Sequence, residues 1–409
     1  MTEPSKEAAA PRALNGVLVL DLSRILAGPT ATQLLGDLGA TVLKIENPRT
    51  GGDDTRAWGP PYIETVDGNS DLSAYFLAAN RNKFSVAADL ATSEGQALVK
   101  SIAAQAQIVL ENYKPGGLEK YGLDYDSLCR INPGLVYCSI SGFGQTGPNR
   151  DLPGYDLMAQ GFGGIMSITG ETEGSPMKVG VGIADVMCGM YATIGMLAAL
   201  RHAEATGEGQ HIDVSLVDTQ MAWLINEGTN FLASGKTPRR RGNNHPNIVP
   251  YGVFPTRDGH IILAVGNDGQ FKALCKVFDR QELAQDERFA TNPLRIANRE
   301  AVDTAISETF QGYDSAQILE MLQIAKVPAG PINSIPQALS SDQARARDAV
   351  VRVPISGATS ETLELLGNPL KFSKTPVRYD KAPPRFGEDT QAVPDLLAKH
   401  APKTISRKG

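Results

Sequence analysis

The chain has 409 residues, more than the roughly 100–200 residues of one ordinary domain, so we expect at least two domains. Hydrophobic residues make up 42% and charged residues 21% of the sequence, a balance that excludes a mainly disordered protein. Lysine and arginine number 39 against 45 aspartates and glutamates, and the net charge of −6 argues against a nucleic-acid-binding protein, whose surface is normally basic.

Short apolar runs alternate with helical stretches through the first half of the chain. The runs are near-continuously apolar, as expected of strands covered on both faces; they are GVLVLDL (16–22), ATVLKIE (40–46), QIVLENY (107–113) and LVYCSIS (135–141). Between them lie stretches with a helical pattern, at 29–38, 71–79, 93–105 and 124–131. This alternation predicts an α/β fold with a doubly wound parallel sheet.

The pattern changes after Gly147. Residues 151–182 are rich in glycine and methionine, 185–204 has the composition of a strongly apolar helix, and 206–216 contains an alternating strand. A basic loop, PRRRGNNHPNIVPY, opens a region with the strands GVFPT and HIILAVG and with charged helices near 269–279 and 299–325. The expected organisation is a disordered lead-in at 1–13, a large domain at 14–225, a smaller α+β domain at 226–333 and a return to the large domain at 334–409.

Targeting, membrane and metal-binding patterns are not found in the sequence. The apolar stretch 186–200 is shorter than the roughly 20 residues that a bilayer helix needs. The N-terminal MTEPSKEAAAPRA lacks the apolar core of a signal peptide. The four cysteines have no CxxC spacing and the five histidines form no HExxH motif. We therefore expect a cytoplasmic protein with no metal site, no disulfide framework and no membrane span.

The segment GFGQTG (142–147) is a G-x-G-x-x-G pattern directly after a predicted strand. A dinucleotide fingerprint also needs a helix to begin there, so that its N–H groups face the pyrophosphate. The run PNRD and then Pro153 follow instead, and no helix starts easily in such a run. We interpret the pattern as a glycine loop rather than a nicotinamide site.

Asp185 is the only carboxylate between Glu173 and Glu204, at the start of the apolar helix. One interpretation is an N-cap, which accepts a backbone N–H and complements the helix dipole. The other is a nucleophile: a carboxylate at a helix N-terminus stays ionised and can attack an activated acyl group to form an anhydride. The glycines that would let a large ligand approach it are Gly180, Gly182 and Gly189.

Several separately spaced motifs resemble one family. They are VLDLSRILAGPTATQLLGDLGATVLKIENPRTGGDDTR, NRNKFSVAADL, ENYKPGGLEKYGLDY, CSISGFGQTGPNRDLPGYD and GIADVMCGMYA, in that order, and the resemblance runs from residue 14 to residue 390. Together they resemble the class III CoA-transferases, the family that includes formyl-CoA:oxalate CoA-transferase. The resemblance implies an interlocked homodimer, in which a large Rossmann-like domain is made from both chain ends and a smaller domain is inserted.

In that family the aspartate of the last motif is the nucleophile, which falls here on Asp185. The implied chemistry is a series of acyl transfers from an acyl-CoA to a small carboxylic acid, through aspartyl anhydrides and an aspartyl-CoA thioester. Each step replaces one activated acyl group by another, so neither a metal nor a tightly bound cofactor is expected. An active-site tyrosine of the transferases falls on Tyr155.

The family's CoA-contacting positions also map onto this chain. Lys120 keeps a basic residue where a phosphate contact is implied, whereas Asn47 stands where an arginine is common. Lys44 and Arg49 lie close by and could substitute for that arginine; an ordinary solvated surface is the alternative for these lysines. The mapped positions are Leu26, Ala27, Asn47, Ala88, Asp89, Leu90, Asn112, Tyr113, Lys114 and Lys120.

Two departures narrow the substrate class. The formyl-CoA transferases of this family have a glutamine where this chain has Leu26, and a leucine side chain cannot hydrogen-bond an oxalyl group. They also have a loop of four glycines where this chain has RGNNHPNIVPY. The motifs GGDDTR, WGPP, NRNK, GFGQTGP and GNNHPNIVPY are most similar to the succinyl-CoA:glutarate branch, so a dicarboxylate acceptor such as glutarate is expected. Residues 239–241 could bind its distal carboxylate or be an ordinary solvated basic run. The substrate loop consists of Gly242, Asn243, Asn244 and His245.

Two alternatives remain at this point. A 2-methylacyl-CoA racemase of the same family needs two acid/base groups, and its histidine in a GHD motif is replaced here by Tyr155, a phenol that is a poor base at neutral pH. A non-catalytic CoA-binding protein would have no need of Asp185. A CoA-transferase fits the sequence best.

Overall fold

A computed structural model describes residues 11–68 and 70–400. The chain forms two compact units, each built from separate stretches of sequence. The first contains the described residues up to 164, residues 179–224 and residues from 343 onward; the second contains 165–178 and 225–342. Most of the lead-in predicted at 1–13 lies outside the described residues.

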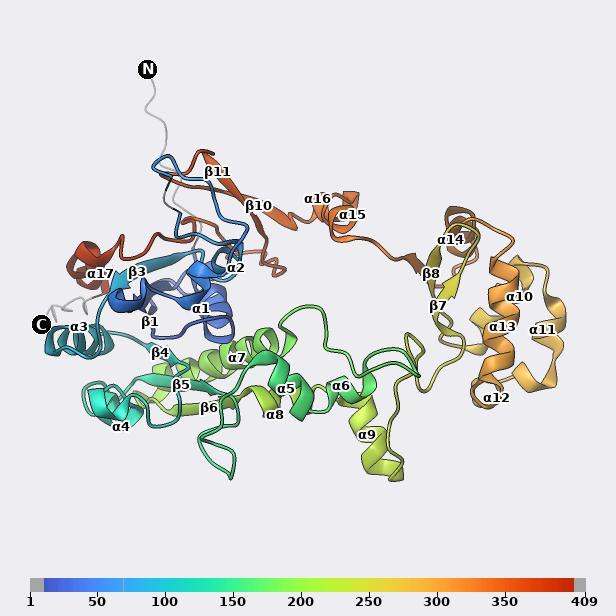
Figure 1. Cartoon of the computed structure of the whole chain (residues 1–409), viewed down its shortest axis with the longest axis horizontal. Coiled ribbons are helices and arrows are strands. Elements are labelled where there is room, and N and C mark those ends of the chain that lie inside the picture. Colours follow the sequence, from blue (N-terminus) through green and yellow to red (C-terminus); the bar gives the residue numbers. More distant parts are fainter. Residues whose placement is uncertain (1–10, 69, 401–409) are drawn as a thin grey trace, which may run out of the picture. The chain divides into compact units, whose positions relative to one another are not determined.

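A parallel sheet of six strands forms the centre of the first unit (Figure 1). Its order is β3-β2-β1-β4-β5-β6, which is the order of doubly wound nucleotide-binding sheets. In such sheets a crevice opens where the strand order reverses, here between β1 and β4. The predicted α/β fold with a parallel sheet is confirmed. The strands are β1 (Leu18–Asp21), β2 (Thr41–Glu46), β3 (Lys83–Ala87), β4 (Ile108–Glu111), β5 (Val136–Ser141) and β6 (His211–Ser215).

Helices cover both faces of this sheet because alternate strand residues point to opposite sides. Val19 and Ile108 pack with α1 (Ala27–Asp37), α5 (Asp156–Phe162), α7 (Ile183–Thr206) and α8 (Leu216–Ala222). Leu20 and Val109 pack with α3 (Ser93–Ala103), α4 (Tyr125–Cys129) and α17 (Val393–His400). The site described below therefore stands on a sheet with two separate, fully buried cores.

The C-terminal part of the chain completes the first unit. A smaller core joins α2 (Ala74–Leu77) to the antiparallel pair β10 (Val350–Pro354) and β11 (Thr362–Leu366). Arg81 donates to the main-chain oxygen of Leu366 at 2.8 Å, and Arg56 donates to that of Pro384 at 3.1 Å. These bonds hold segments that lie about 300 positions apart in the chain.

The second unit packs helices on a three-stranded antiparallel sheet of order β7-β8-β9. Its core includes Phe254, Leu263, Phe271 and Phe310. The strands are β7 (Tyr251–Pro255), β8 (His260–Ala264) and β9 (Ala329–Pro331). The helices are α6 (Ile165–Ile168), α9 (Ile225–Ser234), α10 (Asp268–Val277), α11 (Gln281–Gln285), α12 (Asn292–Ala297), α13 (Arg299–Phe310), α14 (Ser315–Ile324), α15 (Ile335–Leu339) and the start of α16 (Asp342–Ala346).

Residues 165–178 belong to the second unit, whereas the sequence analysis placed them in the large domain. The reason is hydrogen bonding to the basic loop. Gly242 N donates to the main-chain oxygen of Gly170 at 3.2 Å, and Arg240 donates to the main-chain oxygens of Glu171 and Gly174 at 3.2 and 2.8 Å. A glycine-rich run without periodicity gave no indication of these long-range partners.

Most predicted elements of the first half are confirmed. The four apolar runs are β1, β2, β4 and β5, and the predicted helices overlap α1, α2, α3 and α4. Strand β3 was not predicted, because its inward-facing residues include Lys83 and Ser85, both fully buried. Polar residues are normally evidence against a buried strand; here they belong to the ion network described below.

Helix α7 has 24 residues and a mean hydropathy of 1.7 over its most apolar window, so length and composition alone would allow it to cross a membrane. The apolar stretch 186–200 is shorter than a bilayer span, but the helix that forms is longer, so the expectation of no span on grounds of length is wrong. Half of this window is buried inside the protein.

Candidate active site

The predicted CoA-contacting residues gather at one edge of the sheet, where four neighbouring strands end. Asn47 follows β2, 88–90 follow β3, and 112–114 follow β4, while Leu26 and Ala27 close the loop after β1. Asn112 ties the β1 and β4 loops together: its side-chain oxygen accepts from Arg24 N at 2.9 Å, and its side-chain nitrogen donates to Arg24 O at 2.7 Å. This edge is where doubly wound sheets bind ligands.

The side chains at this edge differ in exposure. Ala27, Ala88 and Leu90 are buried in the cores, so their side chains are not available to a ligand. The exposed cations are Lys114 and Lys120, the latter with its ammonium 4.8 Å from the Tyr121 ring centre. Arg49 is also exposed, and its Nε lies 2.5 Å from the Asp89 carboxylate.

Lys44 cannot take the place of the missing arginine, which corrects the sequence analysis. Its side chain is fully buried, and its Nζ donates to Ser23 O and to Asp53 Oδ2, both at 2.8 Å. The alternation of strand residues turns Lys44 into the protein interior, whereas Arg49 lies beyond the strand in a surface turn.

A buried ion network lies beneath the β1 loop. Asp21 accepts from Ser23, Thr32 and the Nζ of Lys83, and these partners together with Lys44 hold the pKa of Asp21 below its ordinary value although burial acts to raise it. Burial lowers the pKa of Lys83 to about 8. Asp53, whose pKa Lys44 lowers to about 2 against the effect of burial, also accepts from Ile25 N at 3.3 Å. The network fixes the loop that carries Leu26.

Ile25 shows how tightly this loop is held. Its φ of +71° lies in the left-handed region, which is strongly unfavourable for a β-branched residue. Such strain persists only where the surroundings over-determine it, and it is concentrated at functional sites. Leu26, next in the chain, lies over the start of α7: its Cδ2 is 3.0 Å from where a Cβ on Gly182 would be.

Asp185 stands in the first turn of α7 but is not its cap. The cap residue is Gly182, and the carboxylate of Asp156 accepts from Ala184 N at 2.8 Å and from Asp185 N at 3.4 Å. The N-cap interpretation of Asp185 is therefore wrong, and the sequence analysis missed Asp156. Capping by a residue 29 positions away leaves no local spacing pattern.

The Asp185 carboxyl has an unusual basicity. Burial, reinforced by the negative charge of Asp156, raises the pKa of Asp185 to about 7. The expectation that the helix N-terminus would keep it fully ionised is wrong, since Asp156 already occupies the nearest N–H groups and adds a like charge. At neutral pH the carboxyl is therefore only partly ionised.

Tyr75, which is not among the predicted site residues, lies close enough to this carboxyl to be affected by its charge. Burial raises the pKa of the Tyr75 phenol, and the charges of Asp185 and Asp156 raise it further. Tyr75 packs edge-to-face against Trp58 with ring centres 5.1 Å apart, and both rings are partly exposed. No local sequence pattern brings Tyr75 and Asp185 together, so only the fold shows that they are neighbours.

The predicted active-site tyrosine, Tyr155, precedes α5 and is 61% exposed.

The glycines flanking Asp185 serve packing more than ligand approach. A Cβ on Gly189 would collide with the main-chain oxygen of Ala27 and with Thr30, so this glycine lets α7 cross α1 closely. Gly142 of the GFGQTG pattern meets Gly154 main chain against main chain. Of the three glycines flanking Asp185, only Gly180 has open space around it. The expectation that these three glycines let a ligand approach Asp185 is therefore wrong for Gly189.

A pocket of about 160 Å³ lies beside Lys114, the last residue of the predicted 112–114 contact segment. Lys114, Gln145 and His211 line it together with Glu111, whose pKa burial raises to about 7. Glu111 also accepts from Tyr113 N at 2.7 Å and so fixes the start of the predicted CoA loop.

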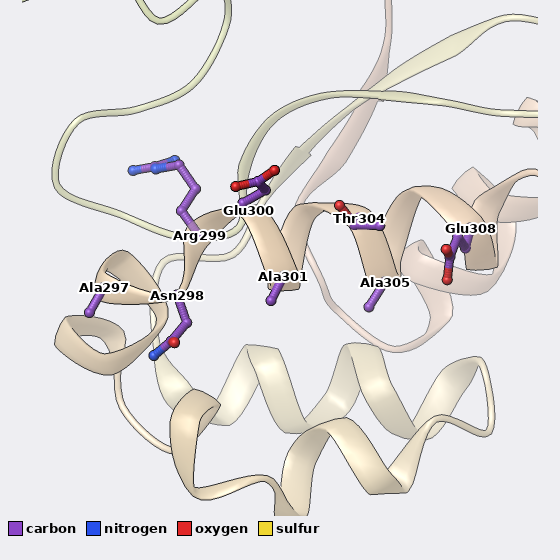
Figure 2. Close-up of a pocket in the computed structure, with 8 residues that line it drawn as sticks. All are labelled: Ala297, Asn298, Arg299, Glu300, Ala301, Thr304, Ala305 and Glu308. Carbon is purple, nitrogen blue, oxygen red and sulfur yellow. The ribbon is translucent and has the colours of Figure 1, made fainter.

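The predicted substrate loop belongs to the second unit. Gly242 has a φ of +56°, Asn244 N donates to Arg241 O at 3.1 Å, and His245 N donates to Tyr251 O at 3.0 Å. Arg241 pairs with Glu227 at 3.1 Å. The bonds of Arg240 and Arg241 within this unit favour a structural role for most of the basic run. A groove of about 560 Å³ along α13 contains none of the predicted site residues (Figure 2).

Comparison with known proteins identifies the family. Residues 14–390 match CoA-transferase family III. A succinate–glutarate CoA-transferase of Agrobacterium fabrum is 50% identical over 93% of this chain and 94% of its own, and a succinyl-CoA:glutarate CoA-transferase of Mus musculus is 38% identical over 95% and 87%. The crystal structure of a CAIB/BAIF family protein from Brucella suis aligns with a TM-score of 0.83 at 46% identity, covering 94% of this chain and 99% of that one. The chain therefore belongs to CoA-transferase family III and is an enzyme that transfers CoA.

Proposed function

We propose that the enzyme moves CoA from succinyl-CoA to glutarate through covalent intermediates on Asp185. The observation that carries this proposal is the partly buried Asp185 carboxyl in the first turn of α7, beside the sheet edge that gathers the predicted CoA contacts. The names of the 50% and 38% identical relatives support the pair of acids.

In the donor half, an oxygen of the ionised Asp185 attacks the thioester carbonyl of succinyl-CoA, the C–S bond breaks and CoA leaves as a thiolate. The thiolate then attacks the aspartyl carbonyl of the mixed anhydride, and succinate leaves. In the acceptor half, a glutarate carboxylate attacks the aspartyl-CoA thioester and releases the thiolate. The thiolate finally attacks the glutaryl carbonyl and restores the Asp185 carboxylate.

The remaining roles follow from position. Lys114, Lys120 and Arg49 are exposed cations at the binding edge, suited to the phosphate groups of CoA. Tyr75, whose pKa the Asp185 charge raises, and Tyr155, which precedes the Asp156 that caps α7, would supply phenol groups for hydrogen bonds to the acyl group. The 242–245 loop selects the acceptor. No metal or tightly bound cofactor takes part, and the enzyme works in the cytoplasm.

We further propose an interlocked homodimer, with a Rossmann-like large domain and a small domain inserted into it. Several large apolar side chains are exposed on α5 and α7 of a single chain, more than a stable monomer usually leaves in contact with water. A second copy would cover them, and sedimentation analysis should give twice the chain mass; a monomer would contradict this. These side chains are Leu157, Met158, Phe162, Met190, Tyr191 and Ile194.

Trapping tests the covalent intermediate. Incubation with succinyl-CoA followed by hydroxylamine should convert Asp185, and no other carboxylate, to a hydroxamate that mass spectrometry locates. A panel of labelled carboxylic acids then identifies the acceptors. An active enzyme with unmodified Asp185 would contradict the proposal, and solvent deuterium at the α-carbon of a 2-methylacyl-CoA would favour a racemase.

The pH dependence of the donor half should follow Asp185. Because only the ionised carboxyl is nucleophilic and its pKa is about 7, kcat/KM for succinyl-CoA should fall about tenfold per pH unit below pH 7 and level off above it. Stopped-flow measurement of CoA release gives this profile. A profile that stays flat through pH 7 would show that another group limits the step.

A further inference from the structure

A cluster of alternating charges lies beneath the predicted substrate loop of the second unit. Arg241 pairs with Glu227 of α9, and Arg299, the first residue of α13, reaches back to the loop. The Nη2 of Arg299 donates to the main-chain oxygen of His245 at 2.6 Å and of Pro246 at 3.4 Å. Figure 2 shows the Arg299 side chain extending away from α13, on the other side from Asn298 and Ala301.

Three atoms of this cluster are buried without a hydrogen-bond partner within the part of the chain that the structure describes. They are Glu227 Oε2, Arg299 Nη1 and Asp303 Oδ1. Burial lowers the pKa of the Arg299 guanidinium, with Arg241 adding to the effect and Asp303 opposing it. The cationic Arg299 donor and the two carboxylate acceptors, on Glu227 and Asp303, therefore each have an atom that could form a further hydrogen bond.

Arg299 and Asp303 are four residues apart on α13 and so project from the same face. Burial raises the pKa of Asp303 to about 6 although the charge of Arg299 acts to lower it. The guanidinium therefore has two partners within reach: the loop carbonyls that it now binds, and the carboxylate of Asp303. It would satisfy both Nη1 and Oδ1 if it turned from the loop to Asp303.

We propose that Arg299 positions the substrate loop, 242–245, for binding of the acceptor acid. When the loop moves away, the Arg299 guanidinium instead pairs with the Asp303 carboxylate. Because Arg299 binds main-chain oxygens, it fixes the path of the loop without occupying the side chains of Asn243 and Asn244. The His245 ring accepts from Asn247 N at 3.1 Å through its Nδ1. Exchange of one guanidinium between two partners gives the loop two defined states. The proposal rests on the role of this loop in acceptor selection proposed above.

Hydrogen exchange tests the anchoring without relying on activity. In Arg299→Met, the amides of Gly242, Asn244 and His245, all hydrogen-bonded here, should exchange about tenfold faster, as expected from the loss of one charge-assisted bond. Arg299→Lys should fall between, since it keeps the charge but loses the fork. Asp303→Asn should slow exchange or leave it unchanged, because it removes the competing partner.

Kinetics test the role in acceptor binding. Arg299→Met should raise the KM for glutarate about tenfold, for the same lost bond, and flatten the preference among dicarboxylates of different length. Labelling of Asp185 by succinyl-CoA alone should remain at the wild-type rate. The matched control is Arg257→Met, which removes an exposed arginine of the same unit that pairs with Asp314 and does not touch the loop; it should change neither readout.

Unchanged loop exchange and an unchanged KM for glutarate in Arg299→Met would overturn the proposal. An equal loss of Asp185 labelling and of acceptor turnover would also overturn it, since the effect would then be on folding as a whole. Failure of the wild-type enzyme to label Asp185 would instead refute the proposed function, and the exchange comparison would still decide whether Arg299 anchors the loop.

Discussion

Replacing Asp185 with asparagine should reduce CoA transfer by about 10⁴-fold or more, the scale seen when a covalent nucleophile is removed. Asparagine keeps the size and shape of the side chain but its amide cannot form the anhydride. Initial rates with succinyl-CoA and glutarate measure the loss, and the hydroxylamine-sensitive adduct should disappear with it. Retention of more than a few per cent of activity would move the nucleophile elsewhere.

The same substitution should raise the melting temperature. A carboxyl whose folded pKa lies above its unfolded pKa destabilises the fold once both states are ionised, so the penalty on Asp185 develops between the ordinary aspartate pKa and about 7 and is complete above that. The gain in Asp185→Asn should therefore be larger at pH 8 than at pH 5. Calorimetry at the two pH values provides the check, and it also shows that lost activity does not come from unfolding.

Replacing Asp21 with asparagine should lower the free energy of unfolding by about 3–5 kcal/mol, the usual result of removing one partner from a buried ion pair. Asp21 and Lys83 are both fully buried, and Lys44 lies in the same network, so the variant leaves positive charge uncompensated in the interior. Urea denaturation followed by circular dichroism measures the change.

Asp54→Asn is the matched control. Asp54 pairs with Arg24 at 3.0 Å on the surface of the same region, where both side chains are more than 40% exposed, and such pairs contribute about 0–1 kcal/mol. Equal losses in the two variants would mean that the Asp21 network is not held as the structure describes.

Local patterns predicted the frame of the first unit well. The apolar runs of β1, β2, β4 and β5 are buried on both faces and consist mostly of hydrophobic residues, so they are predicted as strands although Asp21 and Lys44 are buried within them. The run of β3 is not predicted, because Lys83 and Ser85 interrupt its apolar pattern; Lys83 is buried together with a charge partner 62 residues away. No window of sequence contains both members of that pair.

The same limit applies to the site. The motifs predicted Asp185 and the residues that follow four strands as parts of one site, and the fold places the ends of those four strands at one edge of the sheet. Asp156, Tyr75 and Arg299 were missed because the group that each one contacts or senses lies far away in the chain. The prediction for Lys44 was wrong because Lys44 and Arg49 are close in sequence but differ in burial. The Lys44 side chain points into the protein, whereas that of Arg49 points into solvent.

The capping of α7 by Asp156 has a consequence for the energetics of the proposed acyl transfer. A nucleophile that must later leave works best when its basicity lies between those of the groups it exchanges. An ordinary carboxylate has a pKa of about 4 and a thiol one of about 8.5, and Asp185, at about 7, lies between them. In the proposed mechanism, with Asp156 holding the helix N–H groups, Asp185 would attack a thioester more readily than an ordinary carboxylate and would still leave when the CoA thiolate attacks in the last step. The Asp156 carboxylate thus sets the basicity of Asp185 at a value that suits both the attack on one thioester and the release of the other.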